Sequence, residues 1–104
     1  MNLTFRQLKV FDVVARHLNY TSAAKELYLS QPAVSMQVKQ LEEQVNLPLI
    51  EKQGKKLYLT EVGKEMHNYA RSTIQQLLDL EETIGQMKTL EQGHLKLAVA
   101  STAN

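Results

Sequence analysis

The chain has 104 residues, of which 43% are hydrophobic and 22% are charged, so one compact core of ordinary size is expected, with no room for a second full domain. It has no cysteine, which excludes a disulfide framework, a Cys-ligated zinc and a cysteine nucleophile, and which is compatible with a reducing cytoplasm. The start of the chain has no signal-peptide core and no apolar run approaches membrane-spanning length, so we expect a soluble, cytoplasmic protein without a membrane partner.

The distribution of charge is more informative than its sum. The net charge of +1 is a weak argument for a nucleic-acid partner. Residues 1–60, however, carry eight Lys or Arg against five Asp or Glu, whereas residues 61–104 carry four against six. A negatively charged partner is therefore expected to bind the N-terminal part of the chain.

A first helix is predicted after Thr4. Thr4 and Gln7 have the spacing of a capping box, in which each side chain binds the backbone N–H of the other residue. Inward-facing side chains then recur at helical spacing, namely Leu8, Phe11, Ala15 and Leu18. We expect this helix to support the two helices that follow.

Residues 20–39 predict a helix, a tight turn and a second helix, which is the layout of a helix-turn-helix. Thr21 is the expected N-cap of the first of these helices and Ser30 that of the second. Pro32 then falls in a first helical turn, where its missing N–H costs no hydrogen bond. The buried faces are predicted to hold Ala23, Ala24 and Leu27 in the first helix and Val34, Val38, Leu41 and Val45 in the second.

The opposite side of the second helix suits a DNA groove in its first two turns only, because Glu42 and Glu43 further along would repel phosphates. The residues predicted to read base edges are Gln31, Pro32, Ser35, Met36 and Lys39, with Met36 against a thymine methyl. Phosphate contacts are expected from Thr21, Ser22, Ser30 and the first backbone amides of the helix. The structural alternative is an ordinary packed helix pair, since a Ser cap followed by an early Pro is common at helix starts.

Residues 49–59 predict a two-stranded wing. Segments 49–52 and 56–59 are typical of short strands, and Gly54 lies in the turn between them. This segment contains three cations, Lys52, Lys55 and Lys56, which we expect to contact the phosphate backbone or the minor groove. A solvated edge kept soluble by lysines is the alternative.

Residues 61–89 predict a long helix with an apolar seam at alternating steps of four and three. The seam residues are Met66, Ala70, Thr73, Leu77, Leu80, Ile84 and Met87. A heptad repeat of this kind is typical of helices that pair, so we expect a homodimer that reads a palindromic double-stranded site. The seam could instead pack on the first helix of its own domain.

The last residues predict a change of structure. Gly93 is expected to break the long helix, and the alternation over residues 95–100 predicts a strand. No other segment of the chain offers that strand a sheet to join.

Taken together, these segments resemble one known family. The run Ala23-Ala24-x-x-Leu27, Ser30-Gln31-Pro32-Ala33-Val34-Ser35-x-Gln37-x-x-x-Leu41-Glu42, Leu49 and Leu59-Thr60-x-x-Gly63 is similar to the DNA-binding domain of LysR-type transcriptional regulators. The likeness extends over nearly all of residues 3–88. It implies a mainly α-helical fold, with a winged helix-turn-helix at residues 1–60 and a dimerising linker helix at 61–89.

The resemblance also carries implications for the whole regulator. It implies that the linker helix pairs antiparallel with its twin and that the full-length parent forms dimers and tetramers. It also implies that residues 90–104 are a hinge and the first strand of a truncated domain that binds a small-molecule effector. Ser101 and Thr102 would then contribute to the effector site. Residues 97–104 are similar to the branch of the family that controls carbon-fixation operons.

Catalysis has little support in the sequence. The three histidines are far apart, and there is no metal-ligand spacing, GxGxxG or phosphate-loop motif. We therefore predict sequence-specific DNA binding and transcriptional regulation, without enzyme activity, metal or cofactor. Two alternatives stay open, a helical protein-interaction module and an architectural DNA binder without sequence choice.

Overall fold

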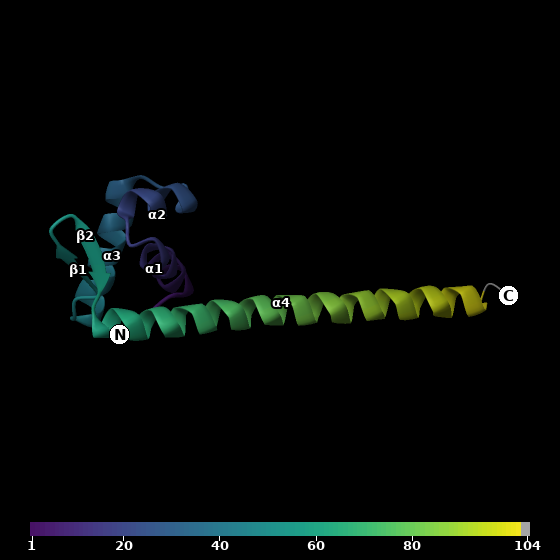
Figure 1. Ribbon diagram of the computed structural model, residues 1–104. Coiled ribbons are helices and arrows are strands. Elements are labelled where there is room, and N and C mark those ends of the chain that lie inside the picture. Colours follow the sequence, from purple (N-terminus) through teal and green to yellow (C-terminus); the bar gives the residue numbers. More distant parts are fainter. Residues whose placement is uncertain (103–104) are drawn as a thin grey trace. The chain divides into compact units, whose positions relative to one another are not determined.

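The computed structural model describes the backbone of residues 1–102 and the side chains of residues 1–93. In that range the elements, in chain order, are α1 (Phe5–His17), α2 (Tyr20–Leu27), α3 (Gln31–Val45), β1 (Ile50–Gln53), β2 (Lys56–Leu59) and α4 (Glu61–Thr102) (Figure 1). The chain divides into two units, residues 1–74 and 75–104. The first unit holds α1, α2, α3, the hairpin and the start of α4, which confirms the mainly α-helical, winged helix-turn-helix fold.

The caps of the first and third helices agree with the sequence. The Thr4 hydroxyl accepts a hydrogen bond from the Gln7 N–H (3.1 Å), and the Gln7 side chain accepts one from the Thr4 N–H (3.0 Å), so the capping box is confirmed. Ser30 caps α3 by accepting from the Ala33 N–H (3.2 Å), and α3 begins at Gln31 with Pro32 in its first turn.

The expected cap of α2 was wrong. Asn19, not Thr21, is the N-cap, and its side-chain oxygen accepts from the Ser22 N–H (2.9 Å). The reason lies in the turn after α1, where Leu18 adopts the left-handed conformation (φ 49°) and donates its N–H to Val14 (2.7 Å). Asn19 is then extended, and α2 begins at Tyr20, two residues earlier than a Thr21 cap would allow.

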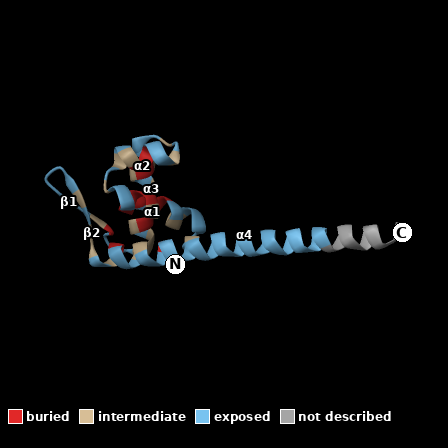
Figure 2. Ribbon diagram, turned by 45° about the vertical axis from the view of Figure 1, so that its right-hand side comes forward, coloured by how far each residue is buried: buried red, intermediate tan, exposed pale blue. Residues whose placement is uncertain are grey.

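The core consists of two clusters of buried side chains, which Figure 2 shows in red on α1, α2 and α3. One cluster joins these three helices and is built from Val10, Val13, Val14, Ala23, Ala24, Val34 and Val38. The other is built from Phe11, Ala15, Leu41 and Leu49. Ile50 packs against both clusters, so the first residue of the wing is held by the helical core. Of the inward face expected for α1, Phe11 and Ala15 are buried, while Leu8 and Leu18 are half-buried.

The wing is an antiparallel hairpin in which Ile50 pairs with Leu59 and Gln53 with Lys56. The first strand starts one residue later than expected, because Leu49 is fully buried in the core and its carbonyl accepts from the Thr60 N–H (3.0 Å). Gly54 has a positive φ of 63° at the first position of the two-residue loop, where tight hairpin turns favour glycine.

The second unit differs from the sequence expectation. The predicted helix end at residue 89, the break near Gly93 and the strand over residues 95–100 were wrong, since α4 is helical to Thr102. A helix pairs its backbone groups within itself, whereas a single strand needs a neighbour. Among the described residues, the sheet consists of the two strands of the hairpin, and residues 95–100 do not join it. No helix among the described residues is both long enough and apolar enough to cross a membrane.

Candidate nucleic-acid interface

The proposed base-reading residues lie on the side of α3 that faces away from the core. Val34, Val38 and Leu41 fill the buried side of this helix. The residues predicted to read bases are exposed at Gln31, Pro32, Met36 and Lys39 and half-buried at Ser35. The helix therefore presents a solvent-facing strip in its first turns, while its other side is fixed by packing.

A hollow of about 230 Å³ brings three elements of the first unit together. Thr21 from α2, Gln31 from α3, and Lys52 and Lys55 from the wing all line it. The sequence placed these residues in separate segments, and the structure makes them neighbours. Lys52 and Lys55 therefore add positive charge to the hollow that Gln31, the first residue of α3, also lines.

The residues around this hollow include Leu18, which was expected only as a core residue, and three that the sequence did not single out, namely Asn19, Tyr20 and Leu57. Asn19 could have been found, because Asn is among the best N-cap residues. Tyr20 also packs against the core, and burial, together with the negative charge of Glu42, raises the pKa of its hydroxyl. The Tyr20 phenol therefore stays protonated and neutral at physiological pH.

The three wing lysines are not equivalent. Side chains of a strand alternate between its faces, and the register pairs Lys52 with Leu57. Lys52 thus shares the face of Ile50, which contacts the core. Lys55 is in the turn, and Lys56 belongs to the opposite face of the hairpin. Lys52 and Lys55 line the hollow, and Lys56 is absent from its described lining.

The carboxylate of Glu42 connects α3 to the wing. Its Oε2 atom accepts hydrogen bonds from the backbone N–H groups of Leu49 (2.7 Å) and Ile50 (3.3 Å). Glu42 is thus an acidic residue near the proposed DNA face that has a structural role, because its carboxylate holds the backbone at the start of the wing.

The remaining phosphate candidates are constrained by capping. The Ser30 hydroxyl accepts from Ala33, but it can still donate its own proton. Ser22 is half-buried, and its N–H is bound to Asn19. Pro32 has no N–H and the Ala33 N–H is used by Ser30, so the backbone amides of α3 contribute less to anion binding than the sequence suggested.

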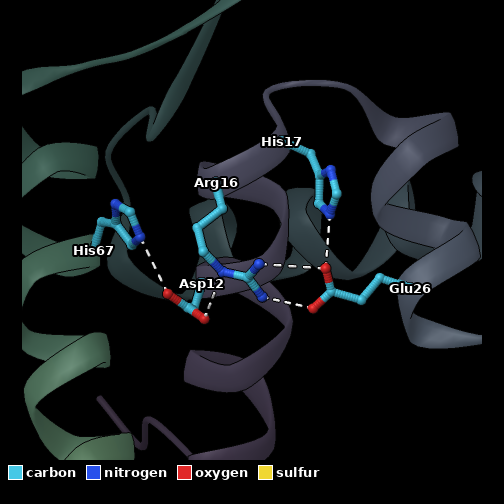
Figure 3. A network of polar contacts seen from close by, with 5 residues as sticks. All are labelled: Asp12, Arg16, His17, Glu26 and His67. Carbon is cyan, nitrogen blue, oxygen red and sulfur yellow. Dashed lines mark hydrogen bonds and ion pairs between the residues drawn. The ribbon is translucent and has the colours of Figure 1, made fainter.

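A polar network that the sequence analysis missed connects α1, α2 and the start of α4 (Figure 3). Arg16 contacts Glu26 through two nitrogens (2.6 and 3.3 Å) and Asp12 through Nε (3.3 Å). His17 contacts Glu26 (2.7 Å), and His67 contacts Asp12 (3.1 Å). The residues that this network joins are up to 55 positions apart in the sequence. Only the Asp12–Arg16 pair, at i and i+4, has a spacing that sequence alone could recognise.

The electrostatics of this network centre on Glu26. Hydrogen bonds from Arg16 and then His17 lower the pKa of the Glu26 carboxyl from 4.5 to about 2. The same contact with Glu26 raises the pKa of the Arg16 guanidinium. Glu26 is therefore ionised at all physiological pH values, and its charge is balanced locally.

The predicted seam of α4 has two different environments. In the first unit, Met66 packs against the second core cluster and Ala70 is fully buried. These two residues therefore belong to the core of their own domain, in line with the alternative that the seam packs within a single chain. Thr73 is exposed, and its hydroxyl donates to the Tyr69 carbonyl (2.8 Å). In the second unit, the side chains of Leu77, Leu80, Ile84 and Met87 are 37% to 60% exposed.

Two further expectations concern metals and effectors. Among the described residues, no group of three or more His, Asp or Glu side chains is arranged to hold a metal ion. The side chains of Ser101 and Thr102, the effector candidates, lie outside the described residues.

Three packed helices, the second and third forming a helix-turn-helix, followed by a two-stranded wing, define the class of winged helix-turn-helix proteins. Residues 5–64 match the family described as bacterial regulatory helix-turn-helix proteins of the lysR family. This match covers more than half of the chain. The chain therefore belongs to the LysR family of transcriptional regulators, it contains the family's DNA-binding domain, and it is not an enzyme.

Curated relatives point to one branch of this family. The chain is 52% identical over 104 residues to a RuBisCO operon transcriptional regulator of Allochromatium vinosum, covering 100% of this chain and 34% of the relative. It is 42% identical over 98 residues to the HTH-type transcriptional regulator CbbR of Rhodospirillum rubrum, covering 94% of this chain and 33% of the relative. The chain thus spans about a third of the length of these relatives.

Solved structures agree with the fold. A complex of the CbnR DNA-binding domain with DNA matches with a TM-score of 0.65 and 34% identity, covering 83% of this chain and 94% of that chain. A complex of the BenM DNA-binding domain with catB site 1 DNA matches with a TM-score of 0.68 and 27% identity, covering 85% and 96%.

Proposed function

We propose that this chain binds a specific double-stranded DNA site as a homodimer and so regulates transcription of carbon-fixation genes. The observation that carries the proposal is the exposed strip at the start of α3, which continues into the hollow lined by Lys52 and Lys55. A helix supported from behind and flanked by cations has the form that an element entering the major groove requires.

Base reading is assigned to the exposed strip. Gln31 and Ser35 offer donors and acceptors to base edges, Lys39 offers donors to guanine, and Pro32 and Met36 offer apolar contact with a thymine methyl. Pairing of the wrong base with these groups costs about 1–3 kcal/mol for each good contact. The CbnR and BenM structures are complexes of such domains with DNA, which supports the same role here.

Phosphate binding is assigned to the rim around the strip. Thr21, Lys52 and Lys55 line the hollow, Ser22 and Ser30 lie near the helix starts, and Lys56 reaches from the other face of the wing. Phosphate contacts position a protein on DNA and add affinity without sequence choice.

Dimerisation is assigned to the exposed part of the seam. Leu77, Leu80, Ile84 and Met87 recur at heptad spacing and stay largely exposed in a single chain, which is unfavourable unless another helix covers them. A second copy of this chain would cover them and place two recognition helices on a palindrome.

The longer protein is proposed from the relatives, which are about three times the length of this chain. We propose that the part of α4 over residues 61–89 belongs to a linker helix, which leads to an effector-binding domain in the longer protein. Dimers would then assemble into tetramers, the effector would bind in that further domain, and the regulator would act in the cytoplasm, where its DNA is.

A binding experiment tests the proposal. Duplexes are first enriched from a random-sequence pool on the 104-residue chain, and fluorescence anisotropy then compares the enriched duplex with a scrambled version at several salt concentrations. We expect the enriched site to be palindromic and to bind at least a thousandfold more tightly than the scrambled one, in line with the usual specificity of about 10³ or more.

The same experiment separates the two alternatives. A helical interaction module would show no shift with either duplex, even at low salt. An architectural DNA binder would bind both duplexes equally. Either result would overturn sequence-specific recognition.

A further inference from the structure

A second hollow in the first unit lies between the start of α1 and the turn that precedes α3. It measures about 280 Å³, and its polar lining comes from Arg6 and Lys9 of α1, Glu26 of α2, and Tyr28 in the turn. The proposed base and phosphate contacts do not include any of these residues.

Tyr28 is an unusual residue for its position. It ends α2 in the left-handed conformation (φ 55°), and its side chain is 95% exposed. A non-glycine residue in this conformation is costly, and helices that end in this way favour Gly or Asn at such positions. Because the phenol ring is not buried, it does not offset the cost of this backbone conformation. A tyrosine at this position therefore does not stabilise the fold through packing.

The charge around this hollow is positive. Arg6 and Lys9 are both exposed, whereas the carboxylate of Glu26 is held by Arg16 (2.6 Å) and His17 (2.7 Å) (Figure 3). The negative charge of Glu26 is thus compensated within the network, and the two cations are left to act on a ligand. A guanidinium, an ammonium and a phenolic hydroxyl are together a donor set suited to phosphate.

The position of the hollow identifies the source of that phosphate. Tyr28 and Leu29 line it, and the next residues are Ser30 and Gln31, where the proposed DNA face begins. An anion seated here would therefore continue the contact that α3 makes.

We propose that Arg6, Lys9 and Tyr28 form an additional clamp on the sugar–phosphate backbone of the bound DNA, separate from the wing. This inference rests on the proposed function, because it requires DNA on α3. The clamp adds affinity and register but no sequence choice, since backbone phosphates are the same in every sequence.

The test measures the salt dependence of binding to the enriched and scrambled duplexes. The variants are Arg6→Ala, Lys9→Ala, Tyr28→Phe and the double variant of the two cations. Lys88→Ala is the matched control, because Lys88 is an exposed cation in the second unit. Circular dichroism checks that each variant keeps its helical content.

Each substitution removes one cation from each protomer of the dimer, so it should lower the slope of log affinity against log salt by about 1.8, twice the value of about 0.9 for one contact. The loss of affinity between 50 and 200 mM salt should then shrink by about twelvefold for each substitution. Tyr28→Phe should weaken binding to both duplexes by the same factor without changing the slope. Lys88→Ala should behave as the unaltered chain does.

Three outcomes are informative. Unchanged slopes in Arg6→Ala and Lys9→Ala would overturn the clamp. A loss confined to the enriched duplex would also overturn it, because it would indicate base reading. If the unaltered chain itself does not prefer the enriched duplex, the proposed function fails first, and the two failures are thereby distinguished.

Discussion

Gly63, in the first turn of α4, lies against the backbone carbonyl of Leu49, so closely that a Cβ atom at position 63 would overlap this carbonyl. The same carbonyl accepts from the Thr60 N–H (3.0 Å). The Thr60 hydroxyl in turn donates to the Pro48 carbonyl (2.7 Å) and accepts from the Gly63 N–H (3.0 Å). The Thr60-x-x-Gly63 spacing therefore joins the base of the wing to the start of the long helix.

Replacing Gly63 by alanine should destabilise the protein by about 1–3 kcal/mol, the usual cost of forcing an atom into a packed site. Gly85 is the matched control, since it is also helical and has open space around it. Gly85→Ala should stabilise the helix by about 0.5–1 kcal/mol. Urea unfolding followed by circular dichroism measures both, and a loss of stability in the two variants alike would contradict the packing argument.

The exposed seam predicts which leucine matters for the dimer. Leu80 is on the seam and Leu78 is off it, although their exposed fractions are nearly the same, 54% and 52%. Leu80→Glu should convert a dimer into a monomer at micromolar concentration, because it places a charge from each copy in an apolar interface. Leu78→Glu should leave the dimer intact. Sedimentation velocity gives the answer, and equal behaviour of the two variants would show that this seam is not the interface.

The helix and the wing should divide recognition between specificity and affinity. Ser35→Arg should change the preferred sequence, because Ser35 faces the groove in the proposed complex. Lys55→Ala should weaken the binding of all duplexes about equally and lower the salt slope by about one for each protomer of the bound dimer. Lys56→Ala should have a smaller effect, since Lys56 belongs to the other face of the hairpin.

Anisotropy titrations of these three variants on enriched and scrambled duplexes make the comparison. Equal losses for Ser35→Arg and Lys55→Ala on both duplexes would refute the division of roles. An effect of Lys56→Ala as large as that of Lys55→Ala would show that both faces of the wing meet the DNA.

Local patterns predicted most of the first unit. The spacing of Val34, Val38 and Leu41 identified the buried side of α3, and Ser30 with Pro32 identified its start. These signals are reliable because they depend on residues within a few turns of each other. The cap of α2 was missed because Asn19, Thr21 and Ser22 are all good capping residues, and the left-handed turn at Leu18 decides among them.

Contacts between distant segments were beyond the reach of the sequence. The hollow near Gln31 and the network around Glu26 depend on how α1, α2, α3 and the wing pack, which no periodicity records. The seam was predicted as a single feature, yet Met66 and Ala70 belong to the domain's own core. The strand expected over residues 95–100 failed because alternation indicates a strand only where a sheet can receive it.

The Glu26 network makes the stability of the first unit depend on pH in a defined range. Arg16 and His17 hold the pKa of the Glu26 carboxyl at about 2, below its ordinary value of 4.5. A carboxyl whose pKa is lowered by folding contributes stability above its unfolded pKa, and this contribution is lost as the pH falls through the folded pKa. Glu26→Gln should therefore have a lower melting temperature than the unaltered chain at pH 7, and the difference should disappear between pH 4.5 and pH 2.

Thermal unfolding from pH 7 to pH 2 measures this difference, with Glu81→Gln as a control that removes the same charge from an exposed position on α4. The control should show no comparable pH-dependent gap. High salt should reduce the Glu26 effect, because the network is partly exposed and its ion pairs are screened. A gap between Glu26→Gln and the unaltered chain that persists unchanged at pH 2 would show that the ionised carboxylate is not what joins α1 to α2.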